Sequence, residues 1–288
     1  MTKILITGAT GFVGATLTRS LIEKGFEISI TARRNSDYWR LDNYKDQLDN
    51  IFYIDLADRD AVFDMIKTIV PDVVFHVATY GGFASQQDKN LIIRTNIDGT
   101  INLLDACIEN GVKRFINTGS SSEYGIKHEP MKETDNCEPV NLYGITKLAG
   151  TNYCSMIGKL KSYKVCTLRL FSPYGELEDS SRLFPSILKS LEKGERPRLS
   201  KPDSVRDFIE IERVISVYHQ MISADFEDGG IYNVGSGKQK SIQEFYWHVA
   251  NSLGITNITP IWGEAASRAV EPRKWEADIK KLKALIDF

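Results

Sequence analysis

A glycine-rich turn between a buried strand and a helix limits what this chain can fold into more than any other feature. Residues 3–7 form an apolar run typical of a strand, and residues 11–24 have helical spacing. Gly8, Gly11 and Gly14 follow the spacing GxxGxxG across the junction. The first glycine permits a tight turn, the second lets a pyrophosphate approach the backbone, and the third lets helix and strand pack closely. Amides at the start of the helix then hold the anion. The residues expected to bind a dinucleotide there are Gly8, Thr10, Gly11, Phe12 and Val13.

Strand-like and helical patterns alternate through the first 170 residues, which indicates a parallel sheet covered on both faces. We predict strands at residues 3–7, 27–32, 51–54, 72–77, 114–118 and 164–170, and helices at 11–24, 58–70, 90–110 and 142–159. After Phe171, turn-rich stretches separate short helices and the alternation ends. The predicted fold is therefore α/β. A Rossmann-type doubly wound parallel sheet occupies residues 1–171, and a smaller, irregular α/β substrate-binding part occupies residues 172–288. Some segments of the second part are expected to return to the main sheet.

Charge and cysteine usage exclude several classes of protein. A net charge of −2 gives no reason to expect nucleic acid or an anionic membrane as a partner. The four cysteines and four histidines do not form a metal-ligand pattern, so we expect reduced cysteines and no metal. The sequence has no apolar run close to the roughly 18 residues that a membrane span needs. Glycines interrupt the apolar N-terminus, which is unlike a signal peptide, and the expected location is the cytoplasm.

Two arginines at the end of the second predicted strand bear on the choice of cofactor. Arg33 and Arg34 begin a long polar connection over residues 33–50, which is expected to be a helical excursion or a mobile loop. NAD-binding proteins usually place Asp or Glu here, to accept hydrogen bonds from the ribose. Guanidinium groups instead suit a 2′-phosphate. We therefore expect NADP(H), with NAD(H) as the alternative if the arginines are only solvated loop residues. Asp55 and Leu56, after the third predicted strand, are expected to meet the adenine.

Tyr143 and Lys147 lie four residues apart, on one face of a predicted helix. Together with Ser120 and the upstream glycine turn, they resemble the active site of the extended short-chain dehydrogenase/reductase family, whose members act on nucleotide sugars. The resemblance covers nearly the whole chain and implies that these three residues are catalytic. Tyr143 would exchange a proton with the sugar, Lys147 would also bind the nicotinamide ribose, and Ser120 would position the sugar oxygen. The ammonium and the nicotinamide charge are expected to lower the pKa of the tyrosine from about 10.

The position of the serines at residues 120–122 indicates which of them is catalytic and argues against a dehydration reaction. In the resembled family the catalytic hydroxyl lies five residues after a strand aromatic and five before a glycine. Counting from Phe115 and from Gly125 leads to Ser120 both times, with Ser121 as the alternative. In the 4,6-dehydratases of the family, Asp and Glu follow this hydroxyl and eliminate water. Ser121 and Ser122 occupy those positions here, so dehydration is not expected.

Downstream segments extend the resemblance. Residues 168–175 resemble the strand beside the nicotinamide, although Ser172 replaces the usual Asn. Residues 182–185 resemble a helix start that packs on the nucleotide base, and residues 205–209 resemble the element whose arginine holds the substrate pyrophosphate. Matches at 232–235 and 271–273 complete the pattern, and residues 78–82 would line the sugar pocket.

The resemblance thereby implies two further sets of contacts. The cofactor contacts beyond the glycine turn are Ala78, Thr79, Asn96, Lys147 and Phe171. The substrate contacts are Thr79, Ser120, Ser121, Ser172, Arg182, Phe184, Arg206 and Arg273.

These observations favour an NADPH-dependent reductase of a CDP- or dTDP-linked 4-keto-6-deoxy (or dideoxy) hexose, of the kind used for polysaccharides and deoxysugars. The arginine pair and the absent dehydratase acids are the reasons. A nucleotide-sugar 4-epimerase with tightly bound NAD(P) shares every motif and remains an alternative. A catalytically silent NADP-binding regulator is the alternative from another class, although Ser120, Tyr143 and Lys147 argue against it. The nucleotide, the sugar and the stereochemistry at C4 are left open.

The resemblance also implies a homodimer. Family members pair two helices across a two-fold axis into a four-helix bundle. The corresponding predicted helices carry apolar residues on more than one face, namely Ile97, Ile101, Leu104, Ile108, Leu148, Tyr153 and Met156.

Overall fold

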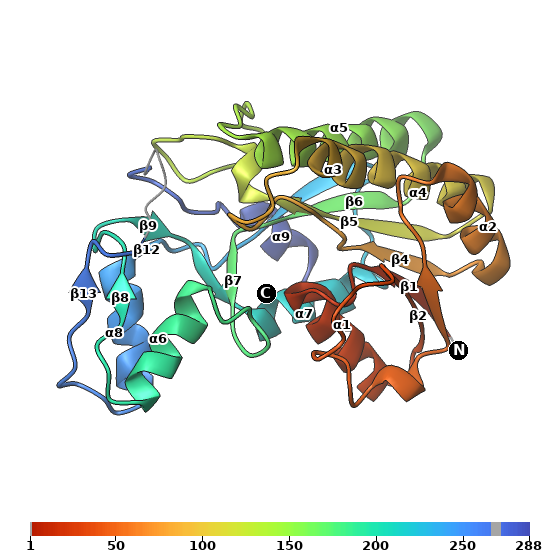
Figure 1. Ribbon diagram of the computed structural model, residues 1–288. Helices are drawn as coiled ribbons and strands as arrows, with labels where there is room; N and C mark the ends of the chain where they lie inside the picture. Colours follow the sequence, from red (N-terminus) through yellow and green to blue (C-terminus); the bar gives the residue numbers. More distant parts are fainter. Residues whose placement is uncertain (1, 266–271) are drawn as a thin grey trace.

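A computed structural model describes residues 2–265 and 272–288 and contains a seven-stranded parallel sheet (Figure 1). Its strand order is β11-β6-β5-β4-β1-β2-β3, and every neighbouring pair is parallel. The strands are β1 (Lys3–Thr7), β2 (Glu27–Ala32), β3 (Asn50–Tyr53), β4 (Val73–His76), β5 (Arg114–Ser120), β6 (Val165–Leu170) and β11 (Gly230–Val234). The order reverses direction between β1 and β4, which is the arrangement of a doubly wound sheet. The predicted α/β class is confirmed.

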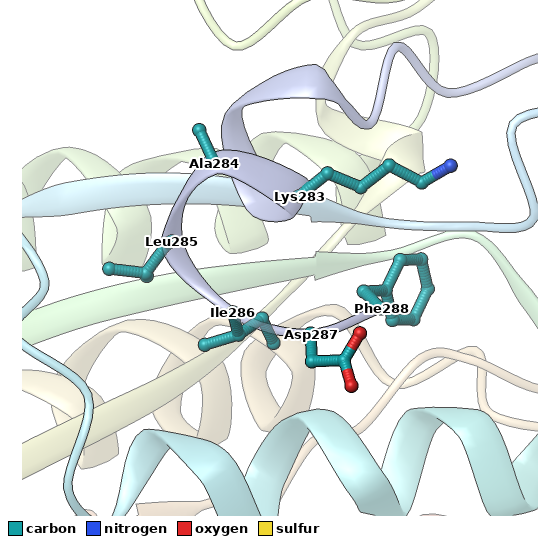
Figure 2. A pocket seen from close by; sticks show the side chains of 6 residues that line it. All are labelled: Lys283, Ala284, Leu285, Ile286, Asp287 and Phe288. Carbon is teal, nitrogen blue, oxygen red and sulfur yellow. The ribbon is translucent and has the colours of Figure 1, made fainter.

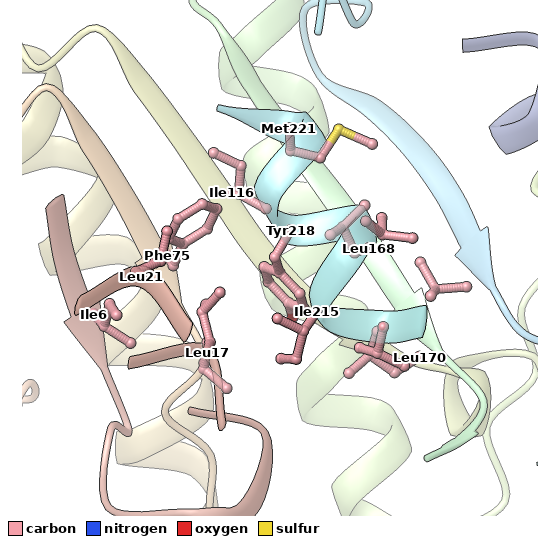
Figure 3. Close-up of a cluster of buried hydrophobic side chains, with 14 of the residues drawn as sticks. Ile6, Leu17, Leu21, Phe75, Ile116, Leu168, Leu170, Ile215, Tyr218 and Met221 are labelled. Carbon is pink, nitrogen blue, oxygen red and sulfur yellow. The ribbon is translucent and has the colours of Figure 1, made fainter. Parts of the chain in front are cut away.

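Helices cover both faces of this sheet, and the strand sequences explain why. In β1, Ile4 and Ile6 face one apolar cluster while Leu5 faces the other, and all three are buried. The first cluster lies under α1 (Phe12–Glu23) and α7 (Ile211–Met221), and Figure 3 shows its side chains converging between strands and helices. The second lies under α2 (Arg59–Ile69), α4 (Gly99–Glu109) and α5 (Leu142–Lys161). Burying each such side chain contributes about 1.5–3 kcal/mol.

A smaller lobe is built from short elements after residue 171. Its helices α6 (Leu183–Glu192) and α8 (Ile242–Ser252) share a third apolar cluster. Its short paired strands are β7 (Ser172–Tyr174) with β10 (Phe208–Glu210), β8 (Arg198–Leu199) with β13 (Ile261–Trp262), and β9 (Val205–Arg206) with β12 (Lys240–Ser241). Figure 1 shows α6 and α8 side by side, beyond the edge of the main sheet.

After its first segments in the small lobe, the chain returns three times to the main sheet or to the helices that cover it. Helix α7 covers one face, β11 pairs with β6, and α9 (Lys280–Leu285) places Leu282 in the first cluster. The small lobe is therefore an insertion entered and left more than once. The last residues, Lys283–Phe288, line a hollow of about 480 Å³ (Figure 2) that includes none of the predicted site residues. Within the described ranges, the helices are too short or too polar to cross a membrane.

Candidate active site

The glycine turn has the shape of an anion cradle. Gly8 has φ +69°, and a Cβ there would lie 2.6 Å from the backbone of Ala78. A Cβ on Gly14 would lie 2.2 Å from the carbonyl oxygen of Gly8. Within this fully described turn, α1 begins without a side-chain cap and without an acid in its first turn. Its free amides therefore suit a pyrophosphate, which fits the dinucleotide expected from the sequence.

Arg40, which the sequence analysis missed, links the glycine turn to the small lobe through hydrogen bonds. Arg40 lies in the connection between β2 and β3. This connection contains one short 3-10 helix, η1 (Lys45–Gln47), and Arg40 holds it in place through two hydrogen bonds. Its Nε donates to the carbonyl of Leu177 at 2.7 Å, and its Nη1 donates to the carbonyl of Thr10 at 3.2 Å. Leu177 has φ +68°, a conformation that costs energy for a residue with a side chain.

Arg182 makes a second hydrogen bond between the small lobe and the main sheet region. Its guanidinium donates to the carbonyl of Gly82 at 2.7 Å and lies 4.2 Å from the centre of the Phe83 ring. Gly82 in turn lies beside the ring of Tyr143. The segment 177–182 therefore runs from the glycine turn to the neighbourhood of Tyr143, and hydrogen bonds hold both of its ends.

The predicted adenine end of the site is open and partly charged. Arg33 and Arg34 are exposed just after β2, and in the described part of the chain their guanidinium groups have no acidic partner. Asp55, after β3, pairs with Arg94 at 3.5 Å across half-exposed side chains. Leu56 is buried close to Gly99.

The three predicted catalytic residues meet at the carboxyl ends of β4 and β5. Tyr143 and Lys147 project from the first turns of α5, and the side chains of Thr79 and Ser120 lie near the Tyr143 hydroxyl, where their interaction with it lowers its pKa. Ser120 ends β5 and its Oγ accepts a hydrogen bond from the amide of Ser122 at 3.1 Å. Of the two candidate serines, Ser120 is thus the one that contacts the tyrosine.

For the protein without cofactor, the expected lowering of the Tyr143 pKa is wrong in direction. Burial raises the pKa of Tyr143 above its ordinary value, and the bonds with Thr79 and Ser120 only partly offset this. Burial also lowers the pKa of Lys147, although the carboxylate of Glu123 acts in the opposite direction. The sequence reasoning counted charges but not the partial desolvation of a half-buried phenol.

Asn96 links the loop after β4 to α5. It lies in a π-helical turn, η2 (Arg94–Asp98), between α3 (Lys89–Ile93) and α4. Its Oδ1 accepts from the Thr79 hydroxyl and the Tyr80 amide, and its Nδ2 donates to the Tyr80 carbonyl and to Thr146 of α5. All its donors and acceptors are used, so it acts by fixing the position of Thr79 beside Tyr143.

A buried histidine continues this network to the glycine turn. His76, at the end of β4, is bonded through Nδ1 to the Thr7 hydroxyl at 2.8 Å and through Nε2 to the Thr100 hydroxyl at 2.9 Å. Thr100 also donates to the carbonyl of Asn96 at 2.8 Å. Because His76 is fully buried, its bonds hold the end of β1 and the helix α4 in one arrangement.

Acid is expected to destabilise the protein through His76. Burial, with the Lys147 ammonium, lowers the pKa of His76 to about 3. Below its ordinary pKa near 6.5 the unfolded chain protonates this residue, whereas the folded chain stays neutral down to about 3. The unfolded state then binds more protons, so the free energy of unfolding falls with falling pH, by up to ~1.4 kcal/mol per pH unit.

Urea unfolding between pH ~7 and ~4.5 measures this dependence. The free energy of unfolding should fall less steeply with pH in His76→Gln than in the wild type, whereas His128→Gln, at an exposed histidine, should keep the wild-type slope. Equal slopes for wild type and His76→Gln would contradict this account.

Two of the predicted substrate contacts, Ser172 and Phe184, belong to the first elements of the small lobe, next to the predicted cofactor contact Phe171. Phe171 is buried and packs near Tyr124, and Ser172 begins β7. Phe184 is half-buried against Tyr174 in an aromatic cluster, with ring centres 5.3 Å apart. That packing gives Phe184 a structural role in addition to any contact with a base.

Two of the predicted substrate arginines adjoin the same short strand. Arg206 pairs with Lys240 of β12, and Gln239, which precedes Lys240, bonds the carbonyl of Arg273. Glu271, which belonged to the same sequence match, lies outside the described residues. The backbones of both arginines therefore lie beside β12.

Comparison with known proteins agrees with this architecture. The sequence profile described as "NAD dependent epimerase/dehydratase family" matches residues 4–235. A relative called "Uncharacterized UDP-glucose epimerase YtcB", from Bacillus subtilis (strain 168), is 26% identical and covers 99% of this chain and 92% of its own length. The solved UDP-glucuronic acid 4-epimerase from Bacillus cereus, in complex with UDP-glucuronic acid and NAD, is 25% identical with a TM-score of 0.83, covering 98% of this chain and 92% of that one. UDP-glucose 4-epimerase from Thermus thermophilus, in complex with NAD, is 25% identical with a TM-score of 0.82 and the same coverages.

The matched profile spans most of the chain and includes the glycine turn, Ser120, Tyr143 and Lys147. The chain is an enzyme of the NAD dependent epimerase/dehydratase family.

Proposed function

We propose that the protein is a nucleotide-sugar 4-epimerase that keeps NAD(P) bound through its reaction cycle. The observation that carries the proposal is the placement of Tyr143 near Ser120, at the end of β5, and near Thr79, with the buried Lys147 one turn further along the helix of Tyr143. One phenol is thereby placed to remove a proton from a sugar hydroxyl and later return it. The epimerases among the relatives, which include two solved 4-epimerases, support this alternative over the reductase that the sequence favoured.

The residues of the chain divide the work of such a reaction. Tyr143 takes the proton of the sugar C4 hydroxyl as the carbonyl forms, and it returns the proton when the oxygen is reduced again. Ser120 donates a hydrogen bond that holds this oxygen, and Lys147 binds the nicotinamide ribose and stabilises the phenolate. A bound nicotinamide supplies a hydride acceptor and donor at C4. Inversion requires that the 4-keto sugar turn over between the two transfers, while Arg206 and Arg273 retain its nucleotide.

The remaining predicted contacts fit the same scheme. The glycine turn with Thr10, Phe12 and Val13 would bind the cofactor pyrophosphate, and Asp55, Leu56, Ala78, Asn96 and Phe171 would line its path. Ser121, Ser172, Arg182 and Phe184 would line the sugar and base pocket. The ties made by Arg40 and Arg182 favour a retained cofactor, because the segment between them lies along its expected path.

An NADPH-dependent 4-keto reductase is the second candidate, and one specific observation favours it. Arg33 and Arg34 stand exposed where a 2′-phosphate would lie, and an acid is absent from that point of the sequence. A reductase consumes its cofactor at every turnover, which suits the NADPH pool.

Cofactor stoichiometry distinguishes the two candidates. The purified protein would be incubated with UDP-glucose, UDP-N-acetylglucosamine or UDP-glucuronic acid, and separately with NDP-4-keto-6-deoxyhexoses and NADPH, with Tyr143→Phe as the inactive control. We expect C4 epimers to equilibrate without net change in absorbance at about 340 nm, the reduced nicotinamide band. Stoichiometric loss of NADPH with a 4-keto substrate would instead establish the reductase.

The protein is expected to form a two-fold dimer through α4 and α5, which lie side by side on one face (Figure 1). Leu104 was assigned to this surface from the sequence, but it is fully buried in the second cluster because it faces the sheet. Met156 and Leu160 of α5 are instead exposed, by 51% and 74%. Sedimentation at micromolar concentration should give a dimer, and Met156→Glu with Leu160→Glu should give a monomer. Leu253→Glu, at an exposed apolar residue elsewhere, should leave the dimer intact, and a monomeric wild type would refute the assignment.

A further inference from the structure

Glu123 is a buried carboxylate directly behind the catalytic serine. It ends the short 3-10 helix η3 (Ser121–Glu123), which begins where β5 stops. Its Oε1 accepts a hydrogen bond from the amide of Ser120 at 2.8 Å, while Ser120 Oγ accepts one from the amide of Ser122. This reciprocal capping box fixes both the backbone and the hydroxyl of Ser120.

Arg169 neutralises that carboxylate from the neighbouring strand. Its Nε donates to Oε2 of Glu123 at 2.7 Å, and the two side chains are 2% and 0% exposed. The guanidinium also lies 4.5 Å from the centre of the Tyr124 ring. Gly119 is opposite Arg169 in the sheet, and a Cβ on it would lie 2.7 Å from Glu123 Oε1. The absence of a side chain at Gly119 is what lets the carboxylate reach the serine.

A purely structural account does not explain this pair well. Removing two charges from water costs several kcal/mol per ion, and apolar residues of similar size often serve stability as well or better. Here the carboxylate also bonds the amide of the serine that contacts Tyr143. Its position thus connects the ion pair to the reacting groups.

We propose that Glu123, paired with Arg169, is a positioning residue of the reaction: it holds Ser120 against the Tyr143 hydroxyl and places a fixed negative charge beside Tyr143 and Lys147. The proposal rests on the proposed function, in which these three residues act on the sugar.

The charge of Glu123 acts on the pKa values of both Lys147 and Tyr143. The Glu123 carboxylate raises the pKa of Lys147 and also that of Tyr143. The other groups that face the pair are Arg182, which lowers the pKa of Tyr143, and Cys154, which raises that of Lys147; the Lys147 ammonium itself contributes to the low pKa of His76. The charge of Glu123 therefore favours the protonated forms of Lys147 and of Tyr143.

Two variants separate the charge from the hydrogen bond. Glu123→Gln keeps an acceptor for the Ser120 amide and removes the charge. The double variant Glu123→Met with Arg169→Met replaces the pair by apolar side chains, so that folding does not depend on one unpaired buried ion. Glu129→Gln removes a charge from an exposed side chain of the following segment and serves as the matched control.

Kinetics test the positioning role. In the double variant we expect kcat to fall about 10- to 100-fold, the loss that a small misplacement of a reacting group causes. KM for the sugar nucleotide and cofactor affinity should stay within about threefold, because the groups that bind them are unchanged. Glu123→Gln should lose much less kcat, and Glu129→Gln none. A double variant that melts at a lower temperature but turns over at the wild-type rate would make the pair merely structural and overturn the proposal.

A titration that needs no substrate tests the charge. In protein labelled with ¹³C at tyrosine Cζ, the Tyr143 resonance is identified by its absence from Tyr143→Phe. We expect its midpoint to move to lower pH in Glu123→Gln and to stay in place in Glu129→Gln. An unmoved midpoint in Glu123→Gln would refute the electrostatic part. If the wild type turned over none of the sugar nucleotides, the proposed function would fail, and this titration would still decide whether Glu123 acts on Tyr143.

Discussion

Replacing Tyr143 with phenylalanine is expected to slow turnover by about 10²–10⁴-fold, the usual contribution of a general acid–base group. The change keeps the ring, which lies beside Gly82, and removes only the hydroxyl that is bonded with Thr79 and Ser120. Cofactor affinity should change little, because it depends on the glycine turn and Lys147. The measurements are kcat by separation of the C4 epimers and cofactor affinity by quenching of protein fluorescence.

Neighbouring variants show whether this loss is specific. Tyr153 lies on the same helix and donates to Asp105, away from the serine, so Tyr153→Phe should retain turnover. Lys147→Ala should impair both turnover and cofactor binding, since Lys147 would serve both. Ser120→Ala should slow turnover far more than Ser121→Ala. Near-normal turnover of Tyr143→Phe would remove the basis of the site assignment.

Replacing both Arg33 and Arg34 with alanine is expected to weaken NADPH about 100-fold while leaving NADH nearly unchanged. Charge-assisted hydrogen bonds contribute roughly 1.5–3 kcal/mol each, and the exposure of both side chains places them at the low end. Two such losses amount to about 3 kcal/mol, which corresponds to about two orders of magnitude in Kd. Titration calorimetry with each cofactor gives the ratio directly.

The control for this prediction removes the same net charge elsewhere. Lys159 and Lys161 are exposed at the end of α5, and their double alanine variant should not change the NADPH to NADH ratio. Equal weakening of both cofactors by the Arg33 and Arg34 changes would show that these arginines do not read the 2′-phosphate. Such a result would also favour the epimerase with NAD.

Local patterns predicted the sheet because a strand buried on both faces is apolar along its whole length. Residues 73–76 illustrate this, since all four are buried. The same logic placed Ser120 at a strand end, where the structure finds it beside the tyrosine. The seventh strand was noted only as a family match at 232–235. Its neighbour β6 is far away in the sequence, so local periodicity could not assign it an edge of the sheet.

The features that were missed depend on distant partners or on burial. Arg40 looks like one more charge in a polar connection, and its acceptors lie 30 and 137 residues away. Glu123 was passed over as a residue of the serine run, because its partner Arg169 is 46 residues away. The tyrosine shift had the wrong sign because desolvation is a property of the folded protein. Leu104 was placed on the dimer surface because helical spacing alone does not tell which apolar face meets the sheet.

The long stretch of sequence between β6 and β11 affects how the sheet folds during synthesis on the ribosome. Strand β6 ends at Leu170 and its outer partner begins at Gly230, so 59 residues must be made between them. At about 5–20 residues per second, that interval is roughly 3–12 s. During it the β6 edge has its backbone donors and acceptors unpaired, and such edges readily pair with other chains. While the inserted lobe is being synthesised, the β6 edge therefore stays open to pairing with other chains until residues 230–234 dock on it.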